Sequence, residues 1–225
     1  PNLVAETAYA KQFFKELAVL KKRWYGLATT EITKDRELFK LIIKSGCKGV
    51  FLGFETVDQS TLNVISKDFN LVRRYGAVIE ELHDNNIIIQ GAFVFGFDHD
   101  DASVFERTVD FVYKYNIDLP SFSVLTPFPR TKVYNDLAKE NRIIERDWAL
   151  YDSEHVVYEP RNMTCHELEH GLHWAWRKAY SIPSIIKRIA GSRTAPGIAF
   201  MTNIGYRHYS QNLSNYTKQV MTDRG

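Results

Sequence analysis

Cysteine is scarce in this 225-residue chain, which has only Cys47 and Cys165. Two cysteines so far apart in sequence exclude a disulfide framework and a metal site built from a cluster of cysteines. Apolar runs are short, and none approaches the roughly 20 residues that a membrane helix needs. The first residues also lack the basic-then-apolar pattern of a signal peptide. Together these absences predict a cytoplasmic protein without a membrane span.

Acidic residues are nearly missing from the last part of the chain. Residues 177–225 hold eight Lys or Arg and a single acid, Asp223, although the net charge of the whole chain is only +2. Such an excess usually forms a solvated face, and we expect no nucleic-acid partner. The alternative is a non-catalytic interaction module, in which the basic segment binds an acidic partner. Salt-sensitive binding would distinguish that module from a solvated face.

Four short apolar runs, each followed by an amphipathic stretch, are the main positive signal. Because strands and helices alternate, the sequence predicts an α/β fold with a parallel sheet. The near-continuous apolar character of the second and third runs predicts that both faces of the sheet are covered. The runs cover residues 24–30, 49–56, 87–97 and 121–127. Helices are predicted over residues 8–17, 33–45 with Thr33 as N-cap, 58–65, 71–85, 104–112, 133–140 and 164–180.

The carboxyl ends of the four runs carry the candidate ligand-binding groups, because parallel sheets bind ligands at that edge. Glu55 closes a strongly apolar run and would accept charge-assisted hydrogen bonds from ligand hydroxyls. An N-cap or an ion pair is the alternative for this carboxylate. Gly91 and Gly96 allow either the close approach of a flat ligand or a β-bulge. The Thr-Pro-Phe-Pro segment at 126–129 predicts a rigid rim, since proline fixes φ.

A second chemical motif lies near the C-terminus, where His166-Glu167-x-x-His170 matches the helical zinc-binding pattern H-E-x-x-H. His173 adds a third imidazole on the same helix face. Glu169 argues against a zinc site, because it places a carboxylate between the histidines. A zinc hydrolase is therefore an alternative function, and a solvated histidine face is the simpler interpretation.

Three of the strand segments together carry a resemblance to a known family. They are residues 46–56, 91–98 and 125–131, with the sequences GCKGVFLGFET, GAFVFGFD and LTPFPRT. These segments resemble the later strands of a radical S-adenosylmethionine (SAM) enzyme. The chain is similar to the class in which a cobalamin-binding domain precedes the barrel and a helical extension follows it. The resemblance implies a partial TIM-type (β/α) barrel over residues 1–140, made of the third to sixth barrel strands, and a mostly helical C-terminal extension over residues 141–225.

The resemblance also implies which residues bind the cofactor. Glu55, at the end of the fourth barrel strand, would meet the SAM ribose. Val94 and Gly96 would lie near the adenine, and residues 126–129 would form the rim of the sixth strand. No catalytic residue and no metal ligand is assigned within this chain. The implied cofactor-binding residues are Glu55, Thr56, Val94, Gly96, Asp98, Thr126 and Pro127.

The chain departs from the family at the iron-sulfur motif. Enzymes of this kind bind a [4Fe-4S] cluster through C-x-x-x-C-x-x-C, which is absent here, and Arg130 replaces the glycine expected in the rim. We therefore expect a C-terminal fragment of a longer enzyme, whose missing N-terminal segment holds the cluster. That parent would cleave SAM and modify an unactivated carbon of a small-molecule or lipid-like substrate, through an adenosyl radical or a cobalamin-borne methyl group. The chain alone should be inactive and, with an unpaired sheet edge, prone to self-association.

Overall fold

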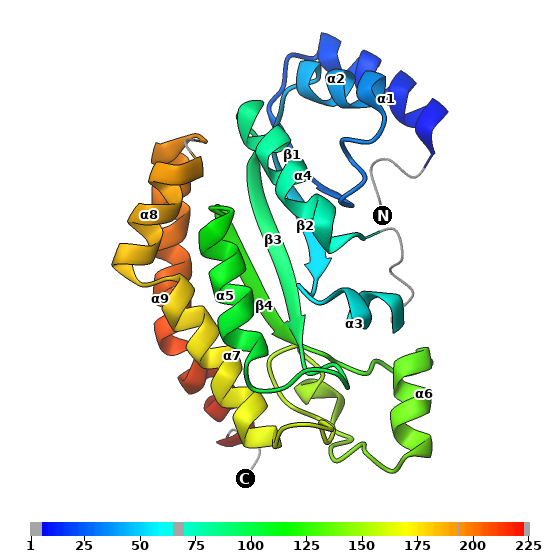
Figure 1. Ribbon diagram of the computed structural model, residues 1–225, viewed down its shortest axis with the longest axis vertical. Coiled ribbons are helices and arrows are strands. Elements are labelled where there is room, and N and C mark those ends of the chain that lie inside the picture. Colours follow the sequence, from blue (N-terminus) through cyan, green and yellow to red (C-terminus); the bar gives the residue numbers. More distant parts are fainter. Residues whose placement is uncertain (1–5, 65–69, 193, 223–225) are drawn as a thin grey trace.

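The computed structural model describes residues 6–64, 70–192 and 194–222 of the chain. Its sheet has four strands in the order β1-β2-β3-β4, and every neighbouring pair is parallel. The strands lie side by side, and β3 and β4 end near the loops that lead to α6 (Lys132–Lys139), whereas β2 ends closer to the middle of the molecule (Figure 1). The strands are β1 (Trp24–Ala28), β2 (Cys47–Glu55), β3 (Ile88–Phe95) and β4 (Leu119–Val124). The predicted α/β fold, a partial TIM-type barrel with a mostly helical extension, is confirmed.

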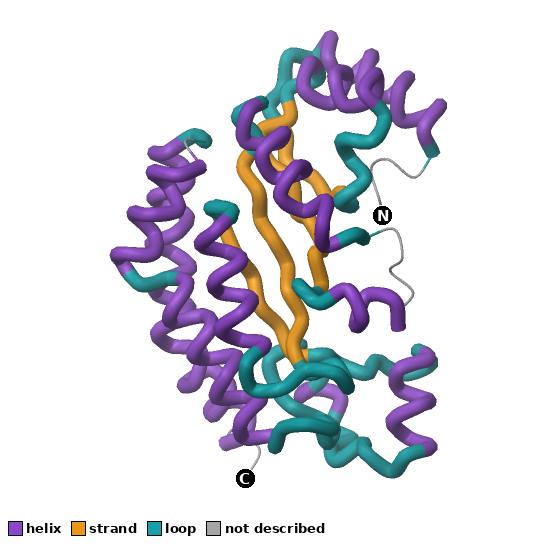
Figure 2. The backbone as a smooth tube through the Cα atoms, viewed as in Figure 1, coloured by secondary structure: helices purple, strands orange, loops and turns teal. Residues whose placement is uncertain are grey.

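Helices connect the strands and then form the extension, as Figure 2 shows by colour. The connecting helices are α1 (Thr7–Val19), α2 (Arg36–Lys44), α3 (Gln59–Val64), α4 (Val72–Asp84) and α5 (Val104–Lys114). The later elements are α6 (Lys132–Lys139), the short 3-10 helix η1 (Trp148–Leu150), α7 (Cys165–Ala179), α8 (Ile182–Ser192) and α9 (Pro196–Thr222). The loops and α6 gather at the carboxyl ends of the strands, while α7, α8 and α9 lie beyond β4 (Figure 1). The extension therefore closes one side of the sheet.

Helix α2 begins later than the sequence predicts. Its N-cap is Asp35, whose Oδ1 accepts hydrogen bonds from the backbone N–H groups of Glu37 and Leu38, both at 3.0 Å. The predicted cap Thr33 is wrong, because a carboxylate next to the first turn satisfies two orphan donors and favours the helix dipole. Helix α7 starts where predicted. Its N-cap Thr164 and Glu167 form a reciprocal capping box.

The two faces of the sheet differ, so the prediction that both are covered is wrong. One face carries Leu52, Phe54, Phe93 and Phe122, which are at most 3% exposed beneath the helices. Phe54 and Phe93 stack with ring centroids 5.4 Å apart, and Phe93 and Phe122 stack at 6.0 Å. Residues that alternate with these are only half-buried. We call this second side the open face. It is the inner wall of a partial barrel, and α4 and α5 pack on the other side, where Tyr75 and Phe111 contact Phe54.

A buried polar cluster joins the extension to the sheet. Arg188 of α8 is 0% exposed, and its guanidinium donates to the backbone carbonyls of Ile117, Asp118 and Ala179 at 2.6–2.9 Å. It also donates to Oδ1 of Asn203 in α9 at 2.8 Å. One side chain thus holds α8, α9 and the start of β4 together.

Part of the basic excess in the extension therefore has a structural role. Besides Arg188, Arg207 donates to the Tyr180 carbonyl at 3.1 Å. The alternative of a non-catalytic interaction module, in which this basic segment binds an acidic partner, is not favoured. Within the described residues, no helix combines the length and apolar character needed to cross a bilayer. The predicted boundary near residue 140 also stays a prediction. Arg142 and Arg161, which follow it, form ion pairs with Asp98, which precedes it.

Candidate functional site

The carboxyl ends of β1 and β2 are connected through side chains. The Thr30 hydroxyl, just after β1, donates to Oδ1 of Asn70. Nδ2 of Asn70 donates to the Gly53 carbonyl of β2 at 3.1 Å. Both Thr30 and Asn70 are buried. This bonding fixes the backbone immediately before Glu55.

Glu55 sits at the end of β2 in an unusual backbone conformation. Its φ is +65°, and the register of the β2–β3 pairing shifts between Gly53 and Glu55. A non-glycine residue with positive φ is held there by its surroundings, as often happens at functional sites. The carboxylate lies over Gly53, since a Cβ added to Gly53 would be only 2.8 Å from Oε1 of Glu55. The backbone bulge and the small neighbour therefore place a carboxylate on the open face.

Two other predicted site residues flank Glu55 in different ways. Val94 is half-buried on the open face of β3 and pairs with Ser123 of β4. Thr56 is 2% exposed, and its hydroxyl accepts a hydrogen bond from the Asp58 backbone at 3.1 Å. Thr56 thus begins the turn into α3. The structure brings Glu55 and Val94 onto the open face. Thr56 is buried and stabilises the turn that follows Glu55.

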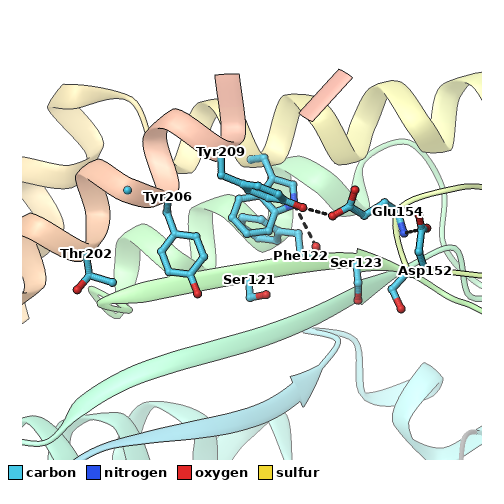
Figure 3. Close-up of a pocket in the computed structure, with 11 residues that line it drawn as sticks. Ser121, Phe122, Ser123, Asp152, Glu154, Thr202, Tyr206 and Tyr209 are labelled. Carbon is cyan, nitrogen blue, oxygen red and sulfur yellow. Dashed lines mark hydrogen bonds between the residues drawn. The ribbon is translucent and has the colours of Figure 1, made fainter. Parts of the chain in front are cut away.

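The α9 recess is a second feature of the open face that the sequence interpretation missed. It is a cavity of about 650 Å³ between β4, the 152–154 loop, α7 and α9 (Figure 3). Its lining residues are Ser121, Phe122, Ser123, Asp152, Ser153, Glu154, Trp176, Thr202, Gly205, Tyr206 and Tyr209. Ser121 and Ser123 alternate with buried residues along β4, so the period-two pattern of that run was the available signal. The α9 residues gave no such signal.

A chain of hydrogen bonds crosses the open face and ends at Tyr206, which lines the recess. The Tyr25 hydroxyl of β1 donates to Oε1 of Gln90 in β3 at 2.9 Å. Nε2 of Gln90 donates to the Tyr206 hydroxyl of α9 at 3.0 Å. Burial is the main cause that raises the pKa of Tyr25. These three neutral side chains link the first strand to the last helix of the described chain.

Gly96 forms a tight turn at the end of β3. Its φ is +98°, and its carbonyl accepts a hydrogen bond from the Tyr158 hydroxyl. A Cβ at Gly96 would lie 2.2 Å from that hydroxyl oxygen, so both the backbone angle and the close approach require glycine. Oδ2 of Asp100 accepts from the backbone N–H groups of Gly96 and Phe97 at 2.9 and 3.0 Å. Asp100 therefore holds the turn from below.

Replacing Asp100 with asparagine should change how stability depends on pH. Burial, opposed by the two backbone hydrogen bonds, raises the pKa of Asp100 to about 6. The folded chain then binds more protons than the unfolded chain between about pH 4 and 6, so Asp100 makes stability fall as pH rises through that window. Asparagine keeps an acceptor oxygen and cannot ionise. We expect Asp100→Asn to be more stable at pH 7 by on the order of 2 kcal/mol, with little gain at pH 4. Urea unfolding at both pH values measures this difference, and a pH-independent difference would contradict it.

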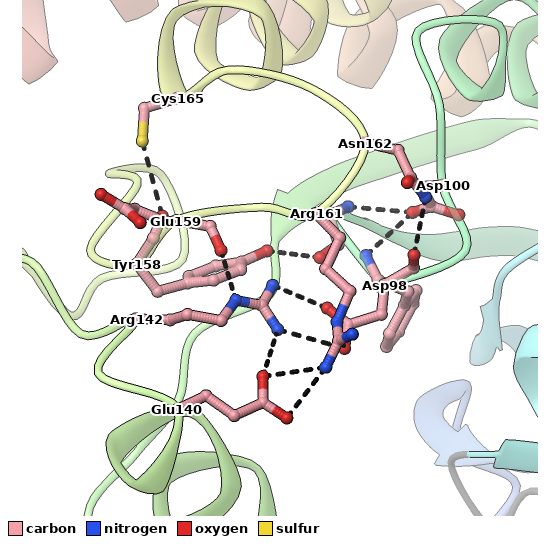
Figure 4. Close-up of polar contacts among 11 residues, drawn as sticks. Asp98, Asp100, Glu140, Arg142, Tyr158, Glu159, Arg161, Asn162 and Cys165 are labelled. Atoms are coloured by element: carbon pink, nitrogen blue, oxygen red, sulfur yellow. Dashed lines mark hydrogen bonds and ion pairs between the residues drawn. The ribbon is translucent and has the colours of Figure 1, made fainter.

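Asp98 faces the extension, where its carboxylate takes part in an ion-pair network (Figure 4). Arg142 lies 2.7 Å from Oδ1 of Asp98, and Arg161 lies 2.8 Å from Oδ2. Both arginines also pair with Glu140, at 3.0 and 2.8 Å. Burial opposes ionisation, but the hydrogen bonds and charges of the two arginines keep the pKa of Asp98 below its ordinary value. Asp98 thus ties the loop after β3 to the extension.

The predicted rim after β4 is compact. The Thr126 hydroxyl donates to the Val124 carbonyl at 3.2 Å, and Thr126 O accepts from the Phe128 backbone at 2.9 Å. Pro127 is buried, whereas Phe128 is 48% exposed. Thr126 and Pro127 therefore stabilise the turn, and the phenyl ring stands at its surface.

The histidine motif of α7 does not assemble a metal site. Within the described ranges, no group of three or more His, Cys, Asp or Glu side chains is arranged to hold a metal ion. Glu167, which would be the catalytic base of the motif, instead accepts hydrogen bonds from the backbone and hydroxyl of Thr164 at 2.7 and 2.9 Å. The glutamate serves the helix cap, and the zinc-hydrolase alternative is not favoured.

Several known proteins are similar to this chain in sequence. No protein-family model matches the chain. It is 32% identical over 190 residues to the bacteriochlorophyllide d C-12(1)-methyltransferase of Chlorobaculum tepidum, covering 84% of this chain and 41% of that protein. It is also 27% identical over 162 residues to the anaerobic magnesium-protoporphyrin IX monomethyl ester cyclase of Cereibacter sphaeroides, covering 71% of this chain and 26% of the cyclase. The chain thus spans well under half the length of these relatives.

A solved structure shows the same fold. The radical S-adenosylmethionine methyltransferase TsrM from Kitasatospora setae, with cobalamin and a [4Fe-4S] cluster bound, superposes with a TM-score of 0.53. The match has 17% sequence identity and covers 62% of this chain and 29% of TsrM.

Proposed function

We propose that this chain, whose relatives identify it as a radical SAM protein of the cobalamin-associated class, contributes the later wall of a SAM-binding barrel. The observation that carries the proposal is the Glu55 carboxylate, which a positive φ and the small Gly53 place on the open face at the carboxyl end of β2. Ribose hydroxyls are donors that match such an acceptor, and charge-assisted hydrogen bonds of this kind are strong. Glu55 is therefore assigned to the ribose of SAM.

The other predicted residues complete this site, some by contact with SAM and others by supporting the residues that contact it. Val94 offers an apolar surface on the open face for the adenine, and Gly96 lets the backbone after β3 approach the ring closely. Thr126 and Pro127 form the opposite rim. Thr56 and Asp98 support the site indirectly. The Thr56 hydroxyl caps the turn after Glu55, and the Asp98 carboxylate anchors the loop after β3 by pairing with Arg142.

The residues of this chain do not fit a [4Fe-4S] cluster. Cys47 is buried, and desolvation raises the pKa of its thiol to about 12, whereas a cluster ligand must be a thiolate. Cys165 lies at the start of α7, and its thiol donates to the Tyr158 carbonyl at 3.6 Å. We assign the cluster ligands, and cobalamin where it is used, to residues outside this chain. When bound, these groups supply the reductive cleavage of SAM and the transfer of methyl.

The substrate of the complete protein is proposed to be a small molecule that is methylated at an unactivated carbon. Support comes from the relatives, two of which are named as methyltransferases of bacteriochlorophyllide d and two as cyclases of a magnesium porphyrin ester. A tetrapyrrole is accordingly the first substrate to test. The protein contributes binding, orientation and exclusion of water around the reacting carbon.

The complete protein, with its cluster reconstituted under anaerobic conditions, provides the test. We expect it to consume SAM in the presence of a strong reductant and to methylate a bacteriochlorophyllide, with the product measured by mass spectrometry. The 225-residue chain treated in the same way should consume none. A complete protein that holds a reduced cluster and still leaves SAM unbound and uncleaved would contradict the proposal.

A further inference from the structure

We propose that the α9 recess binds the flat conjugated part of the substrate and accepts an edge that is neutral or positive and carries hydrogen-bond donors. The inference rests on the proposed function for its biological role. Its physical basis is the lining of the recess, which combines aromatic faces with two carboxylates.

The aromatic wall of the recess comes from α7 and α9. The rings of Trp176 and Tyr206 lie with centroids 5.9 Å apart and an interplanar angle of 28°. Tyr209 meets Trp176 edge-on, at 5.0 Å and 74°. Tyr206 points toward the same side of β4 as Ser121 (Figure 3). Flat conjugated rings stack on such faces, and aromatic side chains give large contact area at low entropic cost.

Two of the three donors of the aromatic wall, those of Trp176 and Tyr209, are already engaged. Nε1 of Trp176 donates to the Phe122 carbonyl at 3.0 Å. The Tyr209 hydroxyl donates to Oε1 of Glu154. The Tyr206 hydroxyl accepts from Gln90, so its own proton remains for a ligand acceptor. The indole and the Tyr209 phenol therefore present faces to a ligand, with few donors.

Acceptors and negative charge dominate the polar lining. Asp152 and Glu154 contribute carboxylates, and Ser121, Ser123 and Thr202 contribute hydroxyls. The Asp152 carboxylate already accepts from the backbone of Glu154 and His155 and pairs with the His155 ring, so Glu154 carries the argument. The lining residues include no Lys or Arg. Arg207, one residue beyond Tyr206 in α9, donates to the Tyr180 carbonyl instead. An anionic edge would meet like charges in a partly desolvated cavity, whereas an N–H, O–H or cationic edge would meet acceptors.

The position of the recess connects it to the proposed SAM site. Ser121 and Ser123 pair in register with Ala92 and Val94 of β3, so they belong to the same open face as Glu55. A ligand stacked on Tyr206 would extend along this face toward the carboxyl ends of the strands. For a tetrapyrrole, the recess would hold an uncharged side of the ring, and any carboxylate would point away from Asp152 and Glu154.

Two flat tricyclic probes of opposite charge test the inference on the full 225-residue chain, without SAM or cluster. Proflavine is a cation with two amino donors, and anthracene-9-carboxylate is an anion of similar size. Fluorescence titration should show proflavine binding at least ~10-fold more tightly, although the net charge of the chain is +2 and would favour the anion. Equal affinity for the two probes would overturn the proposal.

Variants locate the binding. Glu154→Gln keeps the shape of the side chain and an acceptor for Tyr209, and it should weaken proflavine binding about 10-fold. The matched control Glu80→Gln removes an exposed carboxylate from α4 and should leave the affinity unchanged. Tyr206→Ala removes a stacking face and should also weaken binding about 10-fold. Proflavine affinity that is the same in wild type and Glu154→Gln would overturn the assignment, and this variant remains decisive should Tyr206→Ala fail to fold.

The same variant separates this inference from the proposed function. In the complete protein, Glu154→Gln should leave the dissociation constant for SAM unchanged, because the recess lies apart from Glu55 along the open face. A complete protein that fails to bind SAM while the chain still discriminates the probes would reject the proposed function alone. SAM binding with no discrimination between the probes would reject the recess alone.

Discussion

Replacing Arg188 with leucine should lower the free energy of unfolding by about 3–5 kcal/mol, because four buried acceptors would lose hydrogen bonds from a charged donor. Arg188 is completely buried, and its guanidinium satisfies the carbonyls of Ile117, Asp118 and Ala179 together with the amide oxygen of Asn203. Leucine fills much of the volume but removes the guanidinium donors from all four acceptors. The Asp118 and Ala179 carbonyls keep one donor each, Nδ2 of Asn203 and Oγ of Ser184. Each unsatisfied buried acceptor costs about 1–3 kcal/mol. Urea unfolding followed by circular dichroism measures the loss.

Lys187→Leu provides the matched control for this prediction. Lys187 is the preceding residue of α8 and is exposed, so its replacement should change stability by no more than about 0.5 kcal/mol. Arg188→Lys should remain clearly destabilised, because an ammonium group cannot reach four acceptors in the fork geometry of arginine. An Arg188→Leu chain as stable as the Lys187→Leu chain would show that the cluster is not what attaches the extension to the sheet.

Replacing Glu55 with glutamine or alanine in the complete protein should raise the dissociation constant for SAM by about 10- to 100-fold. This range corresponds to a hydrogen bond to a charged group worth about 1.5–3 kcal/mol. Glutamine is the sharper substitution, since it keeps the length of the side chain at a position where φ is +65° and removes only the charge. Equilibrium dialysis with labelled SAM measures the constant directly and does not depend on turnover.

Glu37→Gln is the control for Glu55, because Glu37 is an exposed carboxylate in the first turn of α2, where it pairs with Lys11. It should leave SAM binding unchanged. An unchanged dissociation constant in Glu55→Gln and Glu55→Ala would remove the ribose assignment. The position of the Glu55 carboxylate over Gly53 would then need an explanation other than SAM binding.

Local patterns in the sequence predicted the elements well but predicted only part of the site. The four apolar runs, the end of the predicted helix near residue 45 and the start of α7 at Thr164 depend on neighbours within a few residues, and the structure has each of them. The N-cap of α2 was misplaced by two residues, since Thr33 and Asp35 are both suitable caps and the choice depends on which backbone groups remain unpaired. Glu55 could be proposed from the sequence because a charge at the end of an apolar run is visible locally.

The role of Asp98 could not be read locally. Its partners Arg142 and Arg161 are far along the chain, in the extension, and a sequence gives no measure of which charges fold together. Similarly, Gly96 is a suggestive strand end in the sequence, but its close contact is with Tyr158, 62 residues away. Arg188 would be expected at the surface by its residue type, and only the convergence of three elements makes its burial favourable.

The sequence by itself determined the alternation of parallel strands and helices, the carboxylate at the end of β2 and the resemblance to radical SAM enzymes. The alternation and the carboxylate follow from periodicity and strand-end chemistry, which act over a few residues, whereas the resemblance rests on the sequences of three strand segments. Only the tertiary structure decided that one face of the sheet stays open, that α9 closes its side with aromatic rings, and that Ser121 and Tyr206 line one recess. Such contacts depend on how a curved sheet positions distant segments, because the free energy of packing belongs to the assembled surfaces and to no single stretch of chain.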